Sequence, residues 1–375
     1  MSAIPDLIEH LRTALHPGPY LAKLASGWNL DPARTHCVAI GKAAVAQAAA
    51  FGRFQRCWVV SKKGAPILGD HPIAGPRSYE AGRRLLDELG SVSPEETVVF
   101  LISGGASALA EVPLAPWSEA EVTELGRSLI EGARPIGAAN PLRALVSAHK
   151  AGGLAAACPA ERQFTVWTSD VPADRVEWVG SGPTVEWNPA DHLPPATPHR
   201  LIEWSESPAY REHRERIHRA LEAKTCRYHR LMGPEHAERA ATSWARERRW
   251  ARHVVAGARG MPGPDCVEAF VTAIQKDPPQ GPTLWLSAGE SPFDPPPGGF
   301  VGKGGRCTEW VARTARALEK AGISGPRWKA GAYATDEDDG TTGTAGCWNS
   351  TPIPARETVT NVMDLRFVAY EEAGV

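Results

Sequence analysis

The sequence predicts an α/β protein of two domains: an N-terminal, doubly wound, Rossmann-like domain with a parallel sheet, and a smaller C-terminal α/β domain. At 375 residues, the chain is longer than one hydrophobic core normally supports. Its hydrophobic content of 42% is ample for burial. In the first half, short apolar runs alternate with helical patterns, which is typical of parallel strands joined by helices.

The first element is an amphipathic helix, because Ile4, Leu7, Ile8 and Leu11 fall on one side of a helical projection. The segment lacks the charged start and continuous apolar run of a signal peptide. No stretch of the sequence reaches membrane-spanning length. We therefore expect a cytoplasmic protein that does not interact with membranes.

Apolar runs then predict strands within 35–52, 56–64, 96–114 and 163–174, with a helix near 78–89 between the second and the third. Loops at Lys42, 61–64 and 103–107 follow three of these strands. Ligands of such sheets bind beyond the carboxyl ends of the strands. We therefore expect the three loops to converge on one edge of the sheet.

The second half begins with a Pro-rich polar stretch, 187–199, which predicts a loop or linker. Charged helical segments follow, and a second α/β unit begins near Pro282. The expected domains are a Rossmann-like domain at 1–225, a helical connection at 226–259 and a C-terminal α/β domain at 260–375.

Charge and cysteine content argue against a nucleic-acid-binding protein and a zinc protein. A net charge of −2 and an isoelectric point near 6.6 provide no basic field for binding nucleic acid. Seven scattered cysteines without short paired spacings favour a reducing cytosol and give no zinc signal. The sequence leaves the oligomeric state open, a homodimer included.

Lys42 is a candidate phosphate ligand. It follows an apolar strand and Gly41 and opens an alanine-rich helix, whose unpaired amides favour anions. The segment is not a Walker P-loop, because His36 and Ala43 stand where Gly and Ser or Thr are required. A solvated lysine at a helix start is the alternative.

Two small-residue loops could bring backbone amides close to a phosphate or carboxylate. Their candidate ligand-binding residues are Ser103, Gly104, Gly105 and Ser107 in the first loop and Gly180, Ser181, Gly182 and Thr184 in the second. Plain turns are the alternative for each. No G-x-G-x-x-G fingerprint opens a helix in this sequence, which disfavours hydride transfer.

The remaining candidates are charged. Lys303 and Arg306 lie in a glycine-rich loop before a helix, where an arginine can bind phosphoryl oxygens with two hydrogen bonds. Asp170, Asp336 and Asp339 could hold Mg²⁺ or act as acid or base, although acidic turns are usually only turns. A lone histidine in a turn, His71, is more often structural.

Taken in order, these segments resemble the type II glycerate 2-kinase family, which combines an N-terminal DUF4147 domain with a C-terminal MOFRL domain. The resemblance extends from about residue 3 to 370 and is carried by VAIGKAA, VVSKKG, DHP, LISGGASAL, SAHK, TSDVPAD, VGSGPT, SAGE, GKGGR, ATDEDDGTTGTAG and TNVMDLR. It implies transfer of the γ-phosphoryl group of ATP, with Mg²⁺, to the 2-hydroxyl of D-glycerate in a cleft between the domains. Lys42 and Arg306 would then be the catalytic cations, with Arg143 and Lys150 among the ligand-binding residues.

The chain also departs from the family pattern. Ala144 and Leu145 stand where the family has Lys and His, although Arg143 is kept, and a segment is missing between Thr351 and Thr360. These departures keep two alternatives open. One is a non-catalytic relative that binds a nucleotide, a phosphorylated ligand or a protein partner. The other, less favoured, is a hydroxypyruvate reductase.

Overall fold

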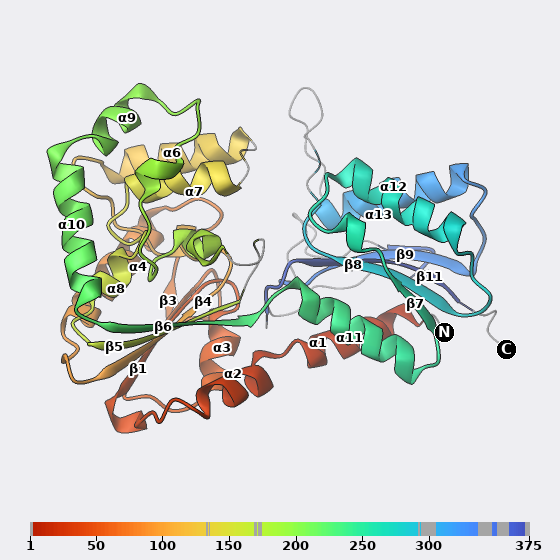
Figure 1. The fold of residues 1–375 in the computed structure, drawn as a ribbon, viewed down its shortest axis with the longest axis horizontal. Coiled ribbons are helices and arrows are strands. Elements are labelled where there is room, and N and C mark those ends of the chain that lie inside the picture. The colour runs from red at the N-terminus through yellow and green to blue at the C-terminus, as the bar shows by residue number, and fades with distance from the viewer. Residues whose placement is uncertain are drawn as a thin grey trace. The chain divides into compact units, whose positions relative to one another are not determined.

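The structure is a computed structural model that describes residues 3–132, 134, 136–168, 171, 175–291, 293, 305–336, 347–350 and 360–371. The chain forms two compact units (Figure 1). One unit comprises residues 17–231, and the other comprises residues 1–16 together with 232–375.

The unit 17–231 is built on a six-stranded sheet in the order β3-β2-β1-β4-β5-β6. Its strands are β1 (Thr35–Ile40), β2 (Arg56–Ser61), β3 (Ile67–Leu68), β4 (Thr97–Ile102), β5 (Arg162–Thr168) and β6 (Thr225–Met232). The pairs from β3 to β5 are parallel. This is the doubly wound order, in which the direction of winding reverses between β1 and β4. The predicted fold class is confirmed.

Helices cover this sheet and add a further layer (Figure 1). They are α2 (Pro17–Ala25), α3 (Ala44–Phe51), α4 (Pro76–Gly90), α5 (Ala106–Leu109), α6 (Glu119–Glu131), α7 (Ile136–Leu145), α8 (Gly153–Ala157), α9 (His199–Ser205) and α10 (Pro208–Glu222), with 3₁₀ turns at Pro32–Arg34, Val176–Ser181 and Pro189–His192. Every residue of β1 and β4 is buried, because parallel strands are covered on both faces. A separate apolar cluster joins α6, α7 and α9.

The second unit contains a mixed sheet in the order β10-β9-β11-β8-β7. Its strands are β7 (Ala251–Val254), β8 (Thr283–Ala288), β9 (Trp328–Ala334), β10 (Cys347–Trp348) and β11 (Asp364–Tyr370). Its helices are α1 (Ile4–Ala14), α11 (Pro234–Glu247), α12 (Gly263–Lys276) and α13 (Arg306–Lys320), with a 3₁₀ turn at Ala256–Ala258. Helices α12 and α13 lie on one face of the sheet and α11 on the other (Figure 1).

This division differs from the expected domain boundaries in two places. Helix α1 belongs to the C-terminal unit, because Leu7 and Leu11 are buried and Asp6 accepts a hydrogen bond of 2.9 Å from Trp244 Nε1 of α11. Helix α11 and strand β7, expected within a connection at 226–259, are parts of the same unit. Among the described residues, no helix is both long and apolar enough to cross a membrane.

Candidate functional site

The loops after β1 and β4 are held together by a close backbone approach. Gly41 has φ +137°, and a Cβ at this position would lie 2.1 Å from Ser103 Oγ. The amide of Lys42 donates to Gly104 O at 2.9 Å, and the amide of Ala43 donates to Ser103 Oγ at 3.2 Å. Lys42 therefore lies at the point where the strand order reverses, two residues before α3 begins.

Gly105 leaves bare backbone beside Lys42. It has φ +88°, and a Cβ there would lie 3.1 Å from His71 Cδ2 and 3.3 Å from Lys42 Cγ. A side chain here would press against His71 and Lys42, whereas the glycine leaves the backbone of the loop uncovered. His71, which the sequence suggested was structural, thus lies against the glycine loop.

A cavity of about 200 Å³ opens beside these loops. Its polar lining consists of His71, Ser107, Asn140, Arg143 and the backbone of Gly104, Gly105 and Gly180, and its apolar lining consists of Pro72, Ala108, Ile130, Ile136 and Trp178. It therefore combines glycine loops from the sheet with side chains of α6 and α7. A few polar groups in a partly apolar concavity are typical of small-molecule sites.

A chain of hydrogen bonds orients one wall of the cavity. Ser181 Oγ donates to Asn140 Oδ1 at 3.1 Å, and Asn140 Nδ2 donates to the carbonyl of Trp178 at 2.8 Å. Ser107 Oγ lies 2.9 Å from Ser181 Oγ. Because Ser181 uses its single proton on Asn140, Ser107 is the donor in this last bond. Its lone pairs are then available to accept a hydrogen bond from a ligand.

Arg143 contributes a positive charge to the cavity. Within the residues that the structure describes, its guanidinium has no hydrogen-bond or salt-bridge partner. Burial lowers the pKa of Arg143, while the charge of Glu111 acts in the opposite direction. An arginine remains protonated nevertheless, so a partly desolvated cation faces the cavity.

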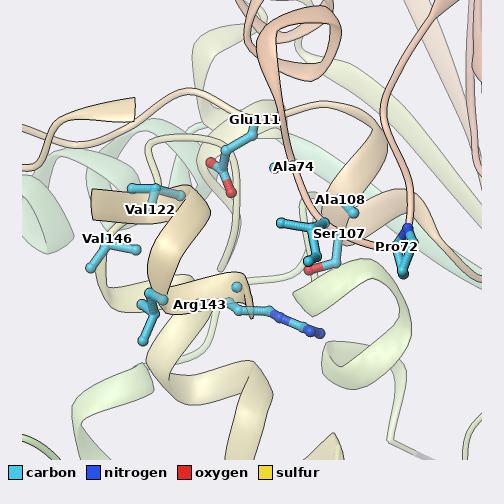
Figure 2. A pocket seen from close by; sticks show the side chains of 11 residues that line it. Pro72, Ala74, Ser107, Ala108, Glu111, Val122, Arg143 and Val146 are labelled. Carbon is cyan, nitrogen blue, oxygen red and sulfur yellow. The ribbon is translucent and has the colours of Figure 1, made fainter. Parts of the chain in front are cut away.

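Arg143 also borders a smaller adjoining pocket that Glu111 lines. Figure 2 shows the Glu111 carboxylate on one side of this pocket and the Arg143 side chain extending toward the side of Ser107. The negative charge of Glu111 therefore favours the protonated form of Arg143. The Arg143 side chain lines both this pocket and the larger cavity.

Lys150 does not line this pocket and is 2% exposed. Its ammonium forms a buried ion pair with Glu111, and Ser147 Oγ donates to the same carboxylate. Burial lowers the pKa of Lys150, and Glu111 opposes that effect. Lys150, expected among the ligand-binding residues, does not line the cavity, and its contacts are those of a residue that positions Glu111.

The second glycine loop contributes only its first two residues. Gly180 lines the cavity, and Ser181 reaches it through Ser107. Gly182 O instead accepts from the amide of Gly152 at 2.8 Å, and the carbonyl of the buried Thr184 accepts from Tyr228 Oη at 3.2 Å. The last two residues therefore anchor the loop.

Arg306 belongs to the other unit, where it begins α13. Its Nη2 lies 2.7 Å from Glu290 Oε1, and its Nε lies 3.4 Å from Asp364 Oδ2. Burial disfavours the charged form, but Asp364 and Glu290 more than offset this and raise the pKa of Arg306. Asp336, which follows β9, adds to the same field. Lys303, Asp170 and Asp339 lie outside the described residues.

No group of three or more His, Cys, Asp or Glu side chains that could hold a metal ion is found in the part of the chain that the structure describes. Mg²⁺ in phosphoryl-transfer sites usually takes only one or two carboxylates beside substrate phosphates and water. Asp336 is the described carboxylate among the three metal candidates.

The two substituted positions near Arg143 lie away from the cavity. Ala144 and Leu145 are buried, and Leu145 packs in the apolar cluster of α6, α7 and α9. In this chain neither Ala144 nor Leu145 lines the cavity, and its polar lining includes Asn140 and Arg143 of the same helix.

Comparison with known proteins identifies the family of the chain and several named relatives that are similar to it. Residues 8–196 match the family described as domain of unknown function (DUF4147). A protein named D-glycerate 2-kinase from Thermotoga maritima is 29% identical over 192 residues, which is 48% of this chain and 46% of that protein. A putative hydroxypyruvate reductase from Agrobacterium vitis is 34% identical over 119 residues, 32% of this chain and 31% of that protein. Each of these matches spans less than half of the relative's length.

Two solved structures share the fold. The crystal structure of a glycerate kinase from Thermotoga maritima has a TM-score of 0.73 and 23% identity, covering 97% of this chain and 98% of that one. A protein from Pyrococcus horikoshii has a TM-score of 0.68 and 20% identity, covering 98% of both chains. The architecture of both units is therefore shared over nearly the whole length.

Proposed function

The chain belongs to the DUF4147 family, and from this premise we propose that it transfers the γ-phosphoryl group of ATP to the hydroxyl of a small hydroxy acid. D-glycerate is the default acceptor and 2-phosphoglycerate the default product. In this step the hydroxyl oxygen bonds to the γ-phosphorus, the bond to the bridging oxygen breaks and ADP leaves. The hydroxyl proton passes to a base, for which Asp170, Asp336 and Asp339 are the candidates.

The observation that carries the proposal is the combination of a bare glycine loop beside Lys42 with an unpaired Arg143 in one cavity. Gly104 and Gly105 line the cavity, where their backbone can approach phosphoryl oxygens, and the Lys42 ammonium can stabilise charge as it develops on them. Phosphoryl transfer depends almost entirely on such positioning and charge stabilisation.

The acceptor acid fits the other side of the same cavity. Arg143 can bind a carboxylate with two parallel hydrogen bonds, and Ser107 can accept a hydrogen bond from the substrate hydroxyl. Together these contacts would hold the acid by its carboxylate and orient its hydroxyl. Such positioning converts a bimolecular reaction into an effectively unimolecular one.

Mg²⁺, when bound with the nucleotide, would supply positive charge that offsets the charge of the phosphoryl group. The carboxylate of Asp336 has the hard oxygen donors that Mg²⁺ prefers. Arg306, oriented by Glu290 and Asp364, is proposed as the second catalytic cation on the family resemblance.

The proposal is tested by incubating the purified protein with ATP, Mg²⁺ and D-glycerate and following ADP and 2-phosphoglycerate. Binding of the nucleotide alone is followed by the thermal unfolding midpoint, because a ligand that binds only the native state stabilises it. A shift with ATP and no turnover on any hydroxy acid would favour the non-catalytic alternative. Oxidation of NADH with hydroxypyruvate would favour the reductase.

A further inference from the structure

The cavity that holds Arg143 has an apolar wall. Ile130 and Ile136 are 38% and 41% exposed, and both line this cavity. Within the described part of the chain only five large hydrophobic side chains are exposed, and these are two of them. Exposed apolar surface gathered at one concavity is typical of a ligand-binding groove.

Trp178 completes this wall and is held in place by two contacts. The Arg175 guanidinium lies 4.1 Å from the centre of its ring. A Cβ at Gly137 would lie only 2.9 Å from the ring, so the absence of a side chain there lets the indole approach α7. The wall is therefore built in advance of ligand binding, which reduces the entropy lost when a ligand is ordered against it.

The polar and apolar parts of the cavity fit different chemical groups of a ligand. Arg143 and Ser107 suit the carboxylate and the hydroxyl of a 2-hydroxy acid. Glycerate, however, has an oxygen on every carbon atom and no apolar group to place against Ile130, Ile136 and Trp178. Its second hydroxyl would lose water at an apolar wall, which weakens binding.

We propose that the preferred acceptor is a 2-hydroxy acid with an apolar side chain, branched or aromatic, which packs against Ile130, Ile136 and Trp178. This inference rests on the proposed phosphoryl transfer and names the substrate class of the same site. A matched methylene group in an apolar pocket changes kcat/KM by about 10- to 200-fold. The side chain of the acid is therefore expected to dominate selectivity.

The test compares four acids at saturating ATP and Mg²⁺: glycerate, lactate, 2-hydroxy-4-methylpentanoate and 3-phenyllactate, each as separate enantiomers. We expect at least one of the two larger acids to exceed glycerate in kcat/KM by about 10-fold or more. A higher kcat/KM for glycerate than for both larger acids would overturn the inference while supporting the kinase.

Calorimetry without nucleotide separates the two proposals. Binding of phenyllactate or 2-hydroxy-4-methylpentanoate without any phosphorylation would support the apolar ligand class and contradict the kinase. If glycerate binds and neither larger acid does, the inference is overturned.

Variants test the wall directly. Ile136→Ser should weaken binding of the larger acids by about 10-fold or more relative to its effect on glycerate. It should leave the unfolding midpoint unchanged, since Ile136 is exposed. Leu68→Ser is the matched control, because Leu68 is 40% exposed in the same unit and does not line the cavity. Equal losses for all acids in Ile136→Ser, or equal effects in both variants, would refute the assignment of the wall.

Discussion

Single glycines determine whether the loops after β1 and β4 can meet. At Gly41 a Cβ would lie 2.1 Å from Ser103 Oγ and 2.6 Å from the carbonyl oxygen of Ser103. Backbone cannot move away as a flexible side chain can. The placement of Lys42 therefore depends on a residue with no side chain immediately before it.

We expect Gly41→Ala to destabilise the protein by several kcal/mol, because it adds a clash to the cost of about 1–3 kcal/mol for a strained backbone conformation. Gly52→Ala is the matched control, since Gly52 has φ +123° but a methyl group at this position would have no atom within 4 Å. The free energies of unfolding in urea measure both. Equal losses in the two variants would show that the approach of the two loops is not tight.

At the same scale, Lys42→Ala and Arg306→Ala should each lower kcat by about 100- to 1000-fold, the usual effect of removing one group that stabilises transition-state charge. Arg306→Lys should restore little, because an ammonium cannot reproduce the planar fork of a guanidinium. Steady-state kinetics on the best acceptor and circular dichroism measure activity and folding.

Ser291→Ala serves as the control for these variants. Ser291 Oγ is buried and has no hydrogen-bond partner among the described residues, so its removal should leave activity unchanged. Full activity in either alanine variant of the two cations would show that the catalytic assignment is misplaced.

At the scale of elements, the segment between α7 and α8 is joined to the segment after α5 by a buried ion pair between Lys150 and Glu111. Removing one partner of a buried pair leaves an uncompensated charge. We expect Lys150→Met to cost about 3–5 kcal/mol of unfolding free energy.

The double variant Lys150→Met with Glu111→Leu should recover part of this loss, because no buried charge then remains without its partner. Chemical denaturation of the single and double variants measures the coupling. A Lys150→Met variant as stable as the parent would show that Lys150 is not committed to Glu111 and is available to a ligand.

His149 makes the same segment sensitive to pH. Burial first, and the charge of Lys150 second, lower the pKa of His149 to about 3, and its Nε2 donates to the carbonyl of Gly82 in α4 at 3.1 Å. The unfolded chain therefore binds a proton at this residue below about pH 6.5, whereas the folded chain does not until about pH 3.

Stability should accordingly be fully present above about pH 6.5 and be lost as the pH falls from there toward about 3, by about 1.4 kcal/mol per unit at most from this group. His149→Gln retains a donor without a titrating ring and should flatten the profile in this window. Denaturation midpoints at several pH values measure it, and an unchanged slope in the variant would contradict a neutral buried His149.

At the scale of the whole molecule, the chain begins in one compact unit, crosses into the other and returns. Residues 1–16 complete the C-terminal unit by packing α1 against α11. Helix α1 and strand β11 therefore belong to one compact unit, and the Rossmann-like unit is inserted between them in the sequence.

We expect Leu11→Ala, at a fully buried position of α1, to cost about 2–5 kcal/mol in the C-terminal unit. Hydrogen exchange measured by mass spectrometry should show lost protection in α11 and β8 and unchanged protection in β1 and β4. Loss of protection concentrated in β1 and β4 would contradict the division of the chain into these two units.

The sequence by itself determined the α/β class, the buried strands β1 and β4, and the position of Lys42 and the glycine loop after their carboxyl ends. These follow from hydrophobic periodicity and from glycine placement, which are properties of short segments. Only the tertiary structure decided that Lys150 pairs with Glu111, that His71, Asn140 and Trp178 join the cavity, and that α1 belongs with α11. Those outcomes depend on which apolar surfaces meet across large separations in sequence. The local pattern of residues does not predict such contacts.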